Sequence, residues 1–374
     1  MKAGYSYVLS AVDRTLTHMK IINVDSYFKD IRGYGYEERL AHKLGASLIL
    51  ATVRTEAEII AACSGCEIIL VEHADTPVNK DVIDRLDACQ LIVKYAVGID
   101  NVDVSAATGR GIVVCHTPNF CVEEVSDHAV ALLLALARRI VQFNDHVRAG
   151  GWAELTIDPP LRRTRNRVLG LVGFGRIARL VAQKMNGFGV KLLVFDPFLD
   201  PKIIEAQGAK PVDLETLFAE SDYISIHTPL TKATRHLVDA KLLARMKPTS
   251  FLINTSRGPV IDEAALCDAL RDKQIAGAGL DVTEIEPLPA SSPLRSFKNV
   301  ILTPHYAANS VESLDDLRYE GAAAIEAFCK GFWPKFVVNP QVQPKRPLAP
   351  WKEFESQSDR LARFDVSGQL VDIV

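Results

Sequence analysis

The chain has 374 residues, of which 48% are hydrophobic, and its formal net charge at pH 7 is −3. A chain of this length buries a sizeable core and is expected to divide into about two domains. The small net charge excludes the broad basic surface that binding to nucleic acid or an anionic membrane requires. Small-molecule chemistry is the better expectation.

Apolar windows and cysteines indicate the cellular setting. No apolar window approaches the roughly 18 to 20 residues of a membrane span, and residues 1–20 lack a clear apolar signal core followed by a cleavage site. The seven cysteines are scattered along the chain and form no disulfide framework. We therefore expect a cytoplasmic protein that contacts no membrane and binds no nucleic acid directly.

The first third of the chain has the pattern of an α/β domain. Between residues 21 and 114, strand-like apolar runs such as Ile68–Val71 and residues 91–93 and 112–114 alternate with amphipathic stretches. This alternation predicts a parallel sheet. Cys63 and Cys66 lead directly into the first of these runs, and no further ligands stand at zinc spacing. We interpret the pair as structural and expect no metal site.

Residues 122–140, with the sequence VEEVSDHAVALLLALARRI, predict one apolar helix after this first unit. A helix of this length can bridge two domains or form a subunit interface. Both interpretations remain open at this point.

The segment from Val168 to Asp196 is the most informative in the chain. Its apolar run Val168–Val172 predicts a buried strand, and residues 173–178 then give the G-x-G-x-x-A form of a phosphate-binding turn. Gly173 allows the tight turn, and Gly175 lets a pyrophosphate approach the backbone at the start of the following helix. These features predict a dinucleotide site.

Asp196 identifies the dinucleotide. It closes the second strand-like run, residues 190–195, about the distance (roughly 20 residues) at which a carboxylate accepts hydrogen bonds from the adenosine ribose. No Arg or Lys stands in residues 197–200 to meet a 2′-phosphate, and the Asp196 charge would repel one. We therefore expect NAD rather than NADP.

The alternation resumes after Asp196 and completes a doubly wound sheet. Further strand-like runs lie at residues 223–227, Phe251–Asn254, residues 278–281 and Val300–Leu302. A helical stretch at residues 311–331 and the run 336–339 are expected to cross back and complete the first domain, leaving an active cleft between the two. Residues 341–374 begin with a segment rich in Pro and charge, which predicts an extended tail with little structure of its own; 361–374 are more apolar and suited to docking on a neighbour.

Three polar side chains follow the later strands, where ligands meet an open α/β sheet. His305 provides a general acid for the reduction of a 2-keto acid and a general base for the reverse reaction. Glu286 would hydrogen-bond the other imidazole nitrogen and favour the charged ring. Arg257 would bind carboxylate and carbonyl oxygens with its planar fork. Together these residues predict hydride transfer at C2 with NADH as the reductant.

Five ordered segments resemble motifs of the D-isomer-specific 2-hydroxyacid dehydrogenases: KYAVGIDNVD, GLVGFGRIA, NTSRGPVIDEAAL, GAGLDVTEIEP and ILTPH. The resemblance covers about residues 21–340. It implies a homodimer of two Rossmann-like doubly wound domains, in which the NAD-binding domain is inserted into a flavodoxin-like substrate domain. The implied boundaries are 1–119 and 309–340 for the substrate domain, 120–308 for the NAD-binding domain and 341–374 for the tail.

The resemblance also implies individual site residues. The catalytic set is Arg257, Glu286 and His305. Cofactor contacts are implied at Val97, Gly173, Gly175, Arg176, Ile177, Asp196, Thr228, Thr255, Ser256, Arg257, Asp281 and His305, with Asp281 facing the nicotinamide. The loop at 94–100 is implied to hold the substrate carboxylate through its N–H groups, with substrate contacts at Lys94, Val97, Gly98, Arg257 and His305. Lys94 either adds charge to this pocket or is simply solvated.

Departures from the family patterns bear on the substrate. Phosphoglycerate dehydrogenases commonly place Arg where this chain has Glu72, which would repel a phosphate. Formate dehydrogenases carry Gln at the position of Glu286, so that reaction is disfavoured. The segment 122–140 is closer to the C-terminal binding proteins, NAD-sensing corepressors in animals, but Ala308 stands where that group has an aromatic residue.

We therefore expect an NAD-dependent oxidoreductase that interconverts a small D-2-hydroxy acid and its 2-keto acid. The alternatives are an NAD(H)-sensing corepressor-like binding protein and a 3-phosphoglycerate dehydrogenase.

Overall fold

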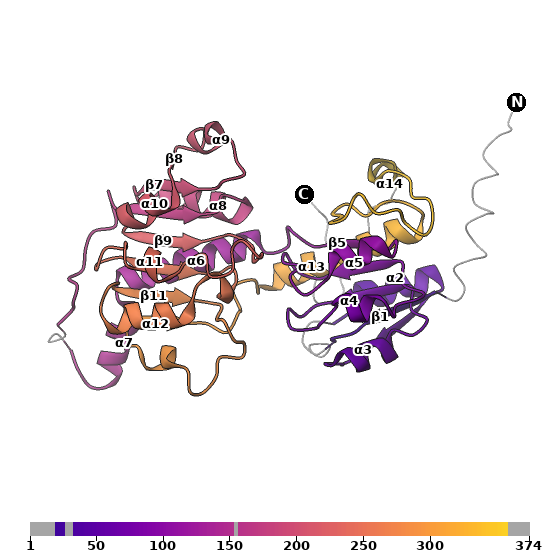
Figure 1. Cartoon of the computed structure of the whole chain (residues 1–374), viewed down its shortest axis with the longest axis horizontal. Helices are drawn as coiled ribbons and strands as arrows, with labels where there is room; N and C mark the ends of the chain where they lie inside the picture. The colour runs from indigo at the N-terminus through magenta and orange to yellow at the C-terminus, as the bar shows by residue number, and fades with distance from the viewer. Residues whose placement is uncertain (1–18, 27–32, 153–155, 358–374) are drawn as a thin grey trace, which may run out of the picture. The chain divides into compact units, whose positions relative to one another are not determined.

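A computed structural model describes residues 19–26, 33–152 and 156–357. Within it the chain forms two compact units (Figure 1). The first unit extends to Phe120 and resumes at Ser310, and the second comprises Cys121–Asn309. None of the helices in the described ranges is long and apolar enough to cross a membrane.

The first unit is built on a five-stranded parallel sheet with the order β2-β1-β3-β4-β5. Its strands are β1 (Lys20–Asn23), β2 (Ser47–Leu50), β3 (Ile68–Val71), β4 (Leu91–Lys94) and β5 (Val113–His116). This order is the flavodoxin-like variant of the doubly wound fold. Its helices are α2 (Gly35–Leu44), α3 (Glu56–Ala62), α4 (Lys80–Ile83), α5 (Val104–Gly109), α13 (Val311–Cys329) and α14 (Trp351–Gln357).

Both faces of this sheet are covered. Side chains of α3, α4 and α5 form one apolar cluster with the strands, and this cluster includes Cys63 and Cys66. Burial raises the pKa of both thiols, as expected for cysteines that serve in packing. The long helix α13 packs against α2 and β4.

The chain after α13 returns to the edge of the sheet at β5. The His116 N–H donates to the carbonyl of Phe336, and the Val338 N–H donates to that of Val114. The side chain of Asn339 continues this pairing, because its Oδ1 accepts from the Val114 N–H at 2.8 Å.

The prediction of a tail with little structure is wrong for residues 341–357. Val342 and Phe354 are buried. The Trp333 N–H donates to the carbonyl of Ala349, and the Ala349 N–H donates to that of Gly331. The rings of Phe354 and Trp351 in α14 pack in a tilted arrangement, with centroids 4.9 Å apart and an interplanar angle of 46°. The segment is rich in Pro and charge, but it also contains the apolar residues Val342, Trp351 and Phe354, which pack within the first unit. Residues 358–374, including the apolar stretch 361–374, lie outside the described residues.

The second unit contains a seven-stranded parallel sheet with the order β12-β11-β10-β9-β6-β7-β8. The strands are β6 (Val168–Val172), β7 (Lys191–Phe195), β8 (Lys210–Pro211), β9 (Tyr223–Ile226), β10 (Phe251–Asn254), β11 (Gly277–Leu280) and β12 (Val300–Leu302). The order reverses between β6 and β9, which is the switch point at which such sheets bind dinucleotides. The predicted doubly wound architecture of both units is confirmed.

Two apolar layers hold helices against the two faces of this sheet. Alternate residues of β9 show the division, because Ile224 and Ile226 point to one layer and Tyr223 to the other. The first layer contains α10 (Leu214–Glu220), α11 (Ala240–Leu243) and α12 (Glu263–Arg271), and the second contains α6 (Val122–Ala137), α8 (Arg176–Asn186) and α9 (Pro201–Glu205). Two short 3-10 turns, η1 (Gly258–Val260) and η2 (Pro293–Ser296), lie in the connecting loops.

The helix predicted for residues 122–140 is present as α6 but ends three residues earlier than predicted. α6 ends at Ala137, and α7 (Ile140–Arg148) begins after Arg139, whose φ of 55° is left-handed. This conformation cannot continue an α-helix, and the sequence has no Gly or Pro at this position that would predict the break. Much of the apolar face of α6 packs against α8, β10 and β11 within its own unit. α7 instead exposes apolar residues, among them Ile140, Val141 and Val147.

We predict that Gly170→Ala lowers the stability of the second unit by about 1–3 kcal/mol. A Cβ at Gly170 would lie 2.6 Å from Leu217 Cδ2 of α10, in a fully buried layer that cannot widen freely. Urea unfolding followed by circular dichroism measures the change. Gly109→Ala in α5 is the matched control, because a Cβ there meets no atom within 4 Å; equal midpoints for the two variants would contradict the prediction.

Candidate active site

The predicted dinucleotide turn follows β6 and has the required geometry. Gly173 has a φ of 86°, and a Cβ on it would lie 3.0 Å from the carbonyl oxygen of His227. Both facts demand glycine at this position. A Cβ on Gly175, by contrast, would meet no atom within 4 Å, so the backbone there borders open space.

The start of α8 differs from the starts of its neighbours. Helices α9, α10, α11 and α12 each begin with an Asp whose carboxylate accepts a backbone N–H of the first turn: Asp200, Asp213, Asp239 and Asp262. Gly175 precedes α8 and supplies no such cap. The first N–H groups of α8 are therefore left for an anion, as at a pyrophosphate site. Arg176 is exposed and Ile177 partly buried in this first turn.

Asp196 stands at the end of β7, beside the glycine turn. Its Oδ2 accepts from the Phe174 N–H at 2.9 Å, and its Oδ1 accepts from the Phe198 N–H at 3.0 Å. These two bonds orient the carboxylate and leave further lone pairs for ribose hydroxyls. The turn, the uncapped helix and this carboxylate together fit NAD.

Three predicted cofactor residues follow β9 and β10. Thr228 comes after His227, a partly exposed residue whose pKa desolvation lowers to about 4, so its imidazole is neutral near the turn at neutral pH. Ser256 donates its hydroxyl and its N–H to Asn254 Oδ1. The hydroxyl of Thr255 is buried and has no partner within the described residues, which leaves it available to a ligand.

The structure brings the predicted catalytic pair together. His305 Nδ1 lies 2.7 Å from Glu286 Oε2, so the predicted hydrogen bond is present and Nε2 is the nitrogen left for a substrate. The Thr283 N–H donates to the other oxygen of Glu286. Arg257 follows β10 and lies close enough for its charge to act on Glu286.

The charge of Glu286 is stabilised within this group. Partial burial raises the pKa of its carboxyl, but the hydrogen bond with His305, the charge of His305 and the backbone bond from Thr283 lower it more. The pKa of Glu286 therefore lies below its ordinary value. The ionised carboxylate of Glu286 can therefore accept a hydrogen bond from His305 Nδ1.

The loop that carries His305 is held by Asp281, whose side chain is almost fully buried. Asp281 Oδ1 accepts from the Thr303 hydroxyl and the Tyr306 N–H, and Oδ2 accepts from the Ala307 N–H. His305 itself has a left-handed φ of 55°, and its N–H donates to the Asp281 carbonyl. These bonds sustain a conformation that a side chain rarely adopts. The predicted nicotinamide contact of Asp281 stays a prediction.

Two residues of this support were missed in the sequence. Thr303 precedes the catalytic histidine by two positions, and His128 of α6 lies 2.9 Å from its hydroxyl through Nε2. The signal for His128 is a histidine that directly precedes the apolar part of α6, residues 129–137. A polar side chain on a buried helix face requires a partner.

The predicted substrate loop follows β4 in the first unit. The N–H groups of Val97 and Gly98 donate no hydrogen bond within the described part of the chain, and Val97 is exposed. Lys94, however, is buried, and its ammonium donates to the carbonyls of Glu72 and His73 at 2.9 and 2.5 Å. The prediction of a solvated Lys94 is wrong, because its charge is directed at a neighbouring loop.

Glu72 is also buried rather than exposed to a ligand. Arg318 of α13 donates to its Oε1 at 2.7 Å, and Asn23 donates to the same oxygen. Desolvation raises the pKa of Glu72, but the charge and hydrogen bond of Arg318 lower it by more. The pKa of Glu72 therefore lies below its ordinary value. The structure places the Glu72 carboxylate in a buried ion pair with Arg318, and the expectation that Glu72 repels a phosphate stays a prediction.

The guanidinium of Arg318 contacts the start of the loop at 94–98, because it lies 5.2 Å from the centroid of the Tyr95 ring. It also approaches Glu37, which accepts the hydroxyl of Tyr95 at 2.8 Å. Tyr95 in turn packs against Gly321 of α13, where a Cβ would overlap its ring. A small residue and a buried ion pair thus fix the residue that opens the loop.

The glycine turn, the uncapped helix and the Glu286–His305 pair define a dinucleotide-dependent oxidoreductase. Comparison with known proteins is consistent with this class. Residues 130–307 match the family model for the D-isomer specific 2-hydroxyacid dehydrogenase, NAD binding domain. The chain is 40% identical over 292 residues to a glyoxylate reductase of Korarchaeum cryptofilum, covering 77% of this chain and 87% of that protein.

Two further relatives show the range of the similarity. A D-3-phosphoglycerate dehydrogenase of Synechocystis is 38% identical over 294 residues, which are 79% of this chain and 52% of that protein. The D-lactate dehydrogenase of Aquifex aeolicus, solved with NAD and lactic acid, superposes with a TM-score of 0.74 at 28% identity, covering 83% of this chain and 96% of that one. The chain belongs to the D-isomer-specific 2-hydroxyacid dehydrogenase family. It is an NAD-dependent oxidoreductase acting on 2-hydroxy and 2-keto acids.

Glu286→Gln is expected to lower kcat for keto-acid reduction roughly tenfold or more, because a charge-assisted hydrogen bond is lost. The pH at which reduction loses half of its rate should also fall, since a neutral amide no longer favours the imidazolium. The profile of kcat/KM against pH measures this shift. Glu284→Gln, a change two residues away, is the control. A pH profile identical to that of the parent protein would contradict the assigned partnership.

Proposed function

We propose that the protein reduces a small 2-keto acid of the glyoxylate type, or oxidises the matching D-2-hydroxy acid. The observation that carries this proposal is the Glu286–His305 hydrogen bond on the loops beyond β11 and β12, with Arg257 beside it. The relative from Korarchaeum cryptofilum named a glyoxylate reductase supports a small substrate.

In this proposal each catalytic side chain has one task. His305 donates a proton from Nε2 to the forming alkoxide in reduction and accepts it in oxidation. Glu286 holds the imidazole through Nδ1 and stabilises its charge. Arg257 binds the carboxylate and polarises the carbonyl of the substrate.

The cofactor and substrate contacts complete the proposal. NADH supplies the hydride when bound, and the residues suited to hold it are Val97, Gly173, Gly175, Arg176, Ile177, Asp196, Thr228, Thr255, Ser256, Arg257, Asp281 and His305. For the substrate carboxylate we propose the free N–H groups of Val97 and Gly98. Lys94 then acts indirectly, because it fastens the start of this loop to residues 72 and 73.

A second anionic group on the substrate is disfavoured. Arg318, a cation packed beneath the 94–98 loop, is occupied by Glu72 and Glu37. Lys94 is occupied by backbone carbonyls. Neither side chain is free to neutralise a phosphate, so we favour an unphosphorylated acid over 3-phosphoglycerate.

The proposal extends to the roles of the domains, the assembly and the location of the protein. We assign substrate binding to residues 1–119 and 309–340, NAD binding to 120–308, and retain 341–374 as a C-terminal segment. A homodimer is supported by the apolar residues that α7 exposes, together with Trp152, which is 82% exposed. The cytoplasm is proposed from the composition and the cofactor.

Turnover should be detected as NADH oxidation with a panel of glyoxylate, pyruvate, hydroxypyruvate, phenylpyruvate and 3-phosphohydroxypyruvate, with the unphosphorylated acids preferred. His305→Ala should remove most of this turnover, by about 10²-fold or more, while NADH binding stays nearly intact. His42→Ala, on the exposed side of α2, is the control. Near-normal turnover in His305→Ala would remove the assigned proton donor. NADH binding without turnover of any acid would favour the corepressor-like alternative.

Asp196→Ala should lower the preference for NADH over NADPH by about tenfold or more, because a charged hydrogen-bond acceptor that also repels the 2′-phosphate is lost. The ratio of kcat/KM for the two cofactors measures the effect. Asp200→Asn, which keeps the cap of α9, should leave the ratio unchanged. An unaltered ratio in Asp196→Ala would show that another residue selects the cofactor.

A further inference from the structure

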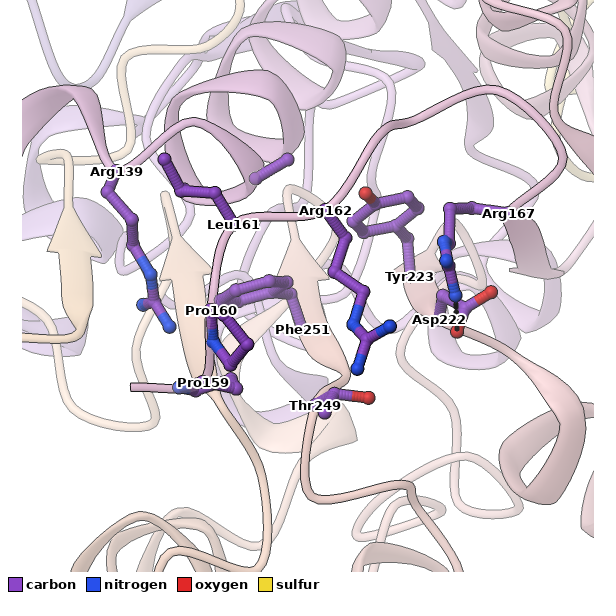
Figure 2. Close-up of a pocket in the computed structure, with 11 residues that line it drawn as sticks. Arg139, Pro159, Pro160, Leu161, Arg162, Arg167, Asp222, Tyr223, Thr249 and Phe251 are labelled. Carbon is purple, nitrogen blue, oxygen red and sulfur yellow. Dashed lines mark ion pairs between the residues drawn. The ribbon is translucent and has the colours of Figure 1, made fainter. Parts of the chain in front are cut away.

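The second unit has a hollow at the edge of its sheet where β9 and β10 begin, remote from the edge that carries the catalytic loops. It is shallow and open to solvent. Figure 2 shows its walls, which combine the apolar surfaces of Pro160, Tyr223 and Phe251 with the guanidinium groups of Arg139, Arg162 and Arg167. Nothing in the proposed reaction uses this hollow.

Arg139 is the principal feature of the hollow. The residue is only 3% exposed, and its guanidinium lies over the ring of Phe251 at 4.8 Å from the centroid. Nη1 donates to the Ala276 carbonyl at 3.4 Å, which is long for a hydrogen bond, and the buried Nη2 has no partner among the described residues. A buried cation with an unsatisfied donor is costly unless a ligand completes it.

The acidic group of the hollow is already engaged. Asp222 Oδ1 lies 3.7 Å from Arg167 Nη1 and accepts from Lys247 Nζ at 3.2 Å, while Oδ2 accepts from the Val168 N–H. Arg139 and Arg162 form no ion pair within the described ranges. Asp158, on the exposed turn before Pro159, is near enough to act on Arg139 through its charge, but the two form no ion pair. The hollow therefore keeps an excess of positive charge.

The lining indicates the chemistry of a ligand. A guanidinium presents a planar fork of donors that matches carboxylate or phosphate oxygens. Burial and the contact with the Phe251 ring restrict the Arg139 side chain, so little side-chain entropy remains to be lost on binding. Arg162, exposed at the rim, adds a second charge. Two unpaired cations favour a ligand with two negative charges.

We propose that this hollow binds a small dianion through phosphate or carboxylate oxygens, with Arg139 as its buried anchor and Arg162 at its rim. The site is distinct from the dinucleotide turn, which follows the carboxyl end of β6, and from Arg257, which follows the carboxyl end of β10. The proposal stands independently of the substrate proposed above.

The test is isothermal titration calorimetry of the full chain saturated with NADH, using inorganic phosphate as one probe and succinate as the other. NADH is present because the glycine turn also attracts oxyanions. The probe that binds more tightly identifies the oxyanion class. We expect saturable binding that Arg139→Gln weakens about 10-fold or more, since a charged hydrogen bond is removed. Arg162→Gln should weaken it less.

Two matched variants make the result decisive. Arg163→Gln removes an exposed charge that does not line the hollow and should leave the affinity unchanged. Arg257→Gln identifies any binding at the catalytic loops. Three results would overturn the proposal. The affinity falls only in Arg257→Gln, the affinity is equal in Arg139→Gln and the parent protein, or binding never saturates. If Arg139→Gln fails to fold, the comparison of Arg162→Gln with Arg163→Gln decides, and equal affinities would refute the site.

Discussion

The parallel arrangement of the second sheet is the constraint on which the candidate active site depends. Because all seven strands run the same way, the loops after β6, β7, β9, β10, β11 and β12 leave from one edge. Gly173 and His305, which are far apart in the chain, therefore both lie at this edge of the sheet. The fold supplies this convergence, but it does not orient the side chains.

Orientation comes from buried polar groups beneath the loops. Asp281 collects three hydrogen bonds from residues 303–307 and keeps His305 in a left-handed conformation. In the first unit, Arg318 and Glu72 perform a similar task beneath Tyr95. Buried charges of this kind give little net stability when compared with apolar packing, and their value lies in selecting one loop conformation. In both units the groups that position the loops are less exposed than the groups assigned to chemistry.

The break between α6 and α7 determines where the side chain of Arg139 lies. Had the helix continued through Arg139, this side chain would have followed the helical repeat. The left-handed φ at Arg139 instead turns the guanidinium inward onto Phe251. The proposed anion site and the exposed apolar residues of α7 both follow from that one residue.

By itself, the sequence determined much of this protein. The glycine spacing at 173–178, Asp196 at the end of a strand, and the polar residues after apolar runs are local patterns, in which neighbouring residues carry the whole signal. They were sufficient for the doubly wound architecture, the family and the Glu286–His305 pair. Only the tertiary structure decided the partners of charged residues. Arg318 and Glu72 are 246 residues apart, and no periodicity records that they meet. For the same reason the sequence left open whether Lys94 is solvated, whereas the structure buries both Lys94 and Glu72. Burial depends on packing between distant elements.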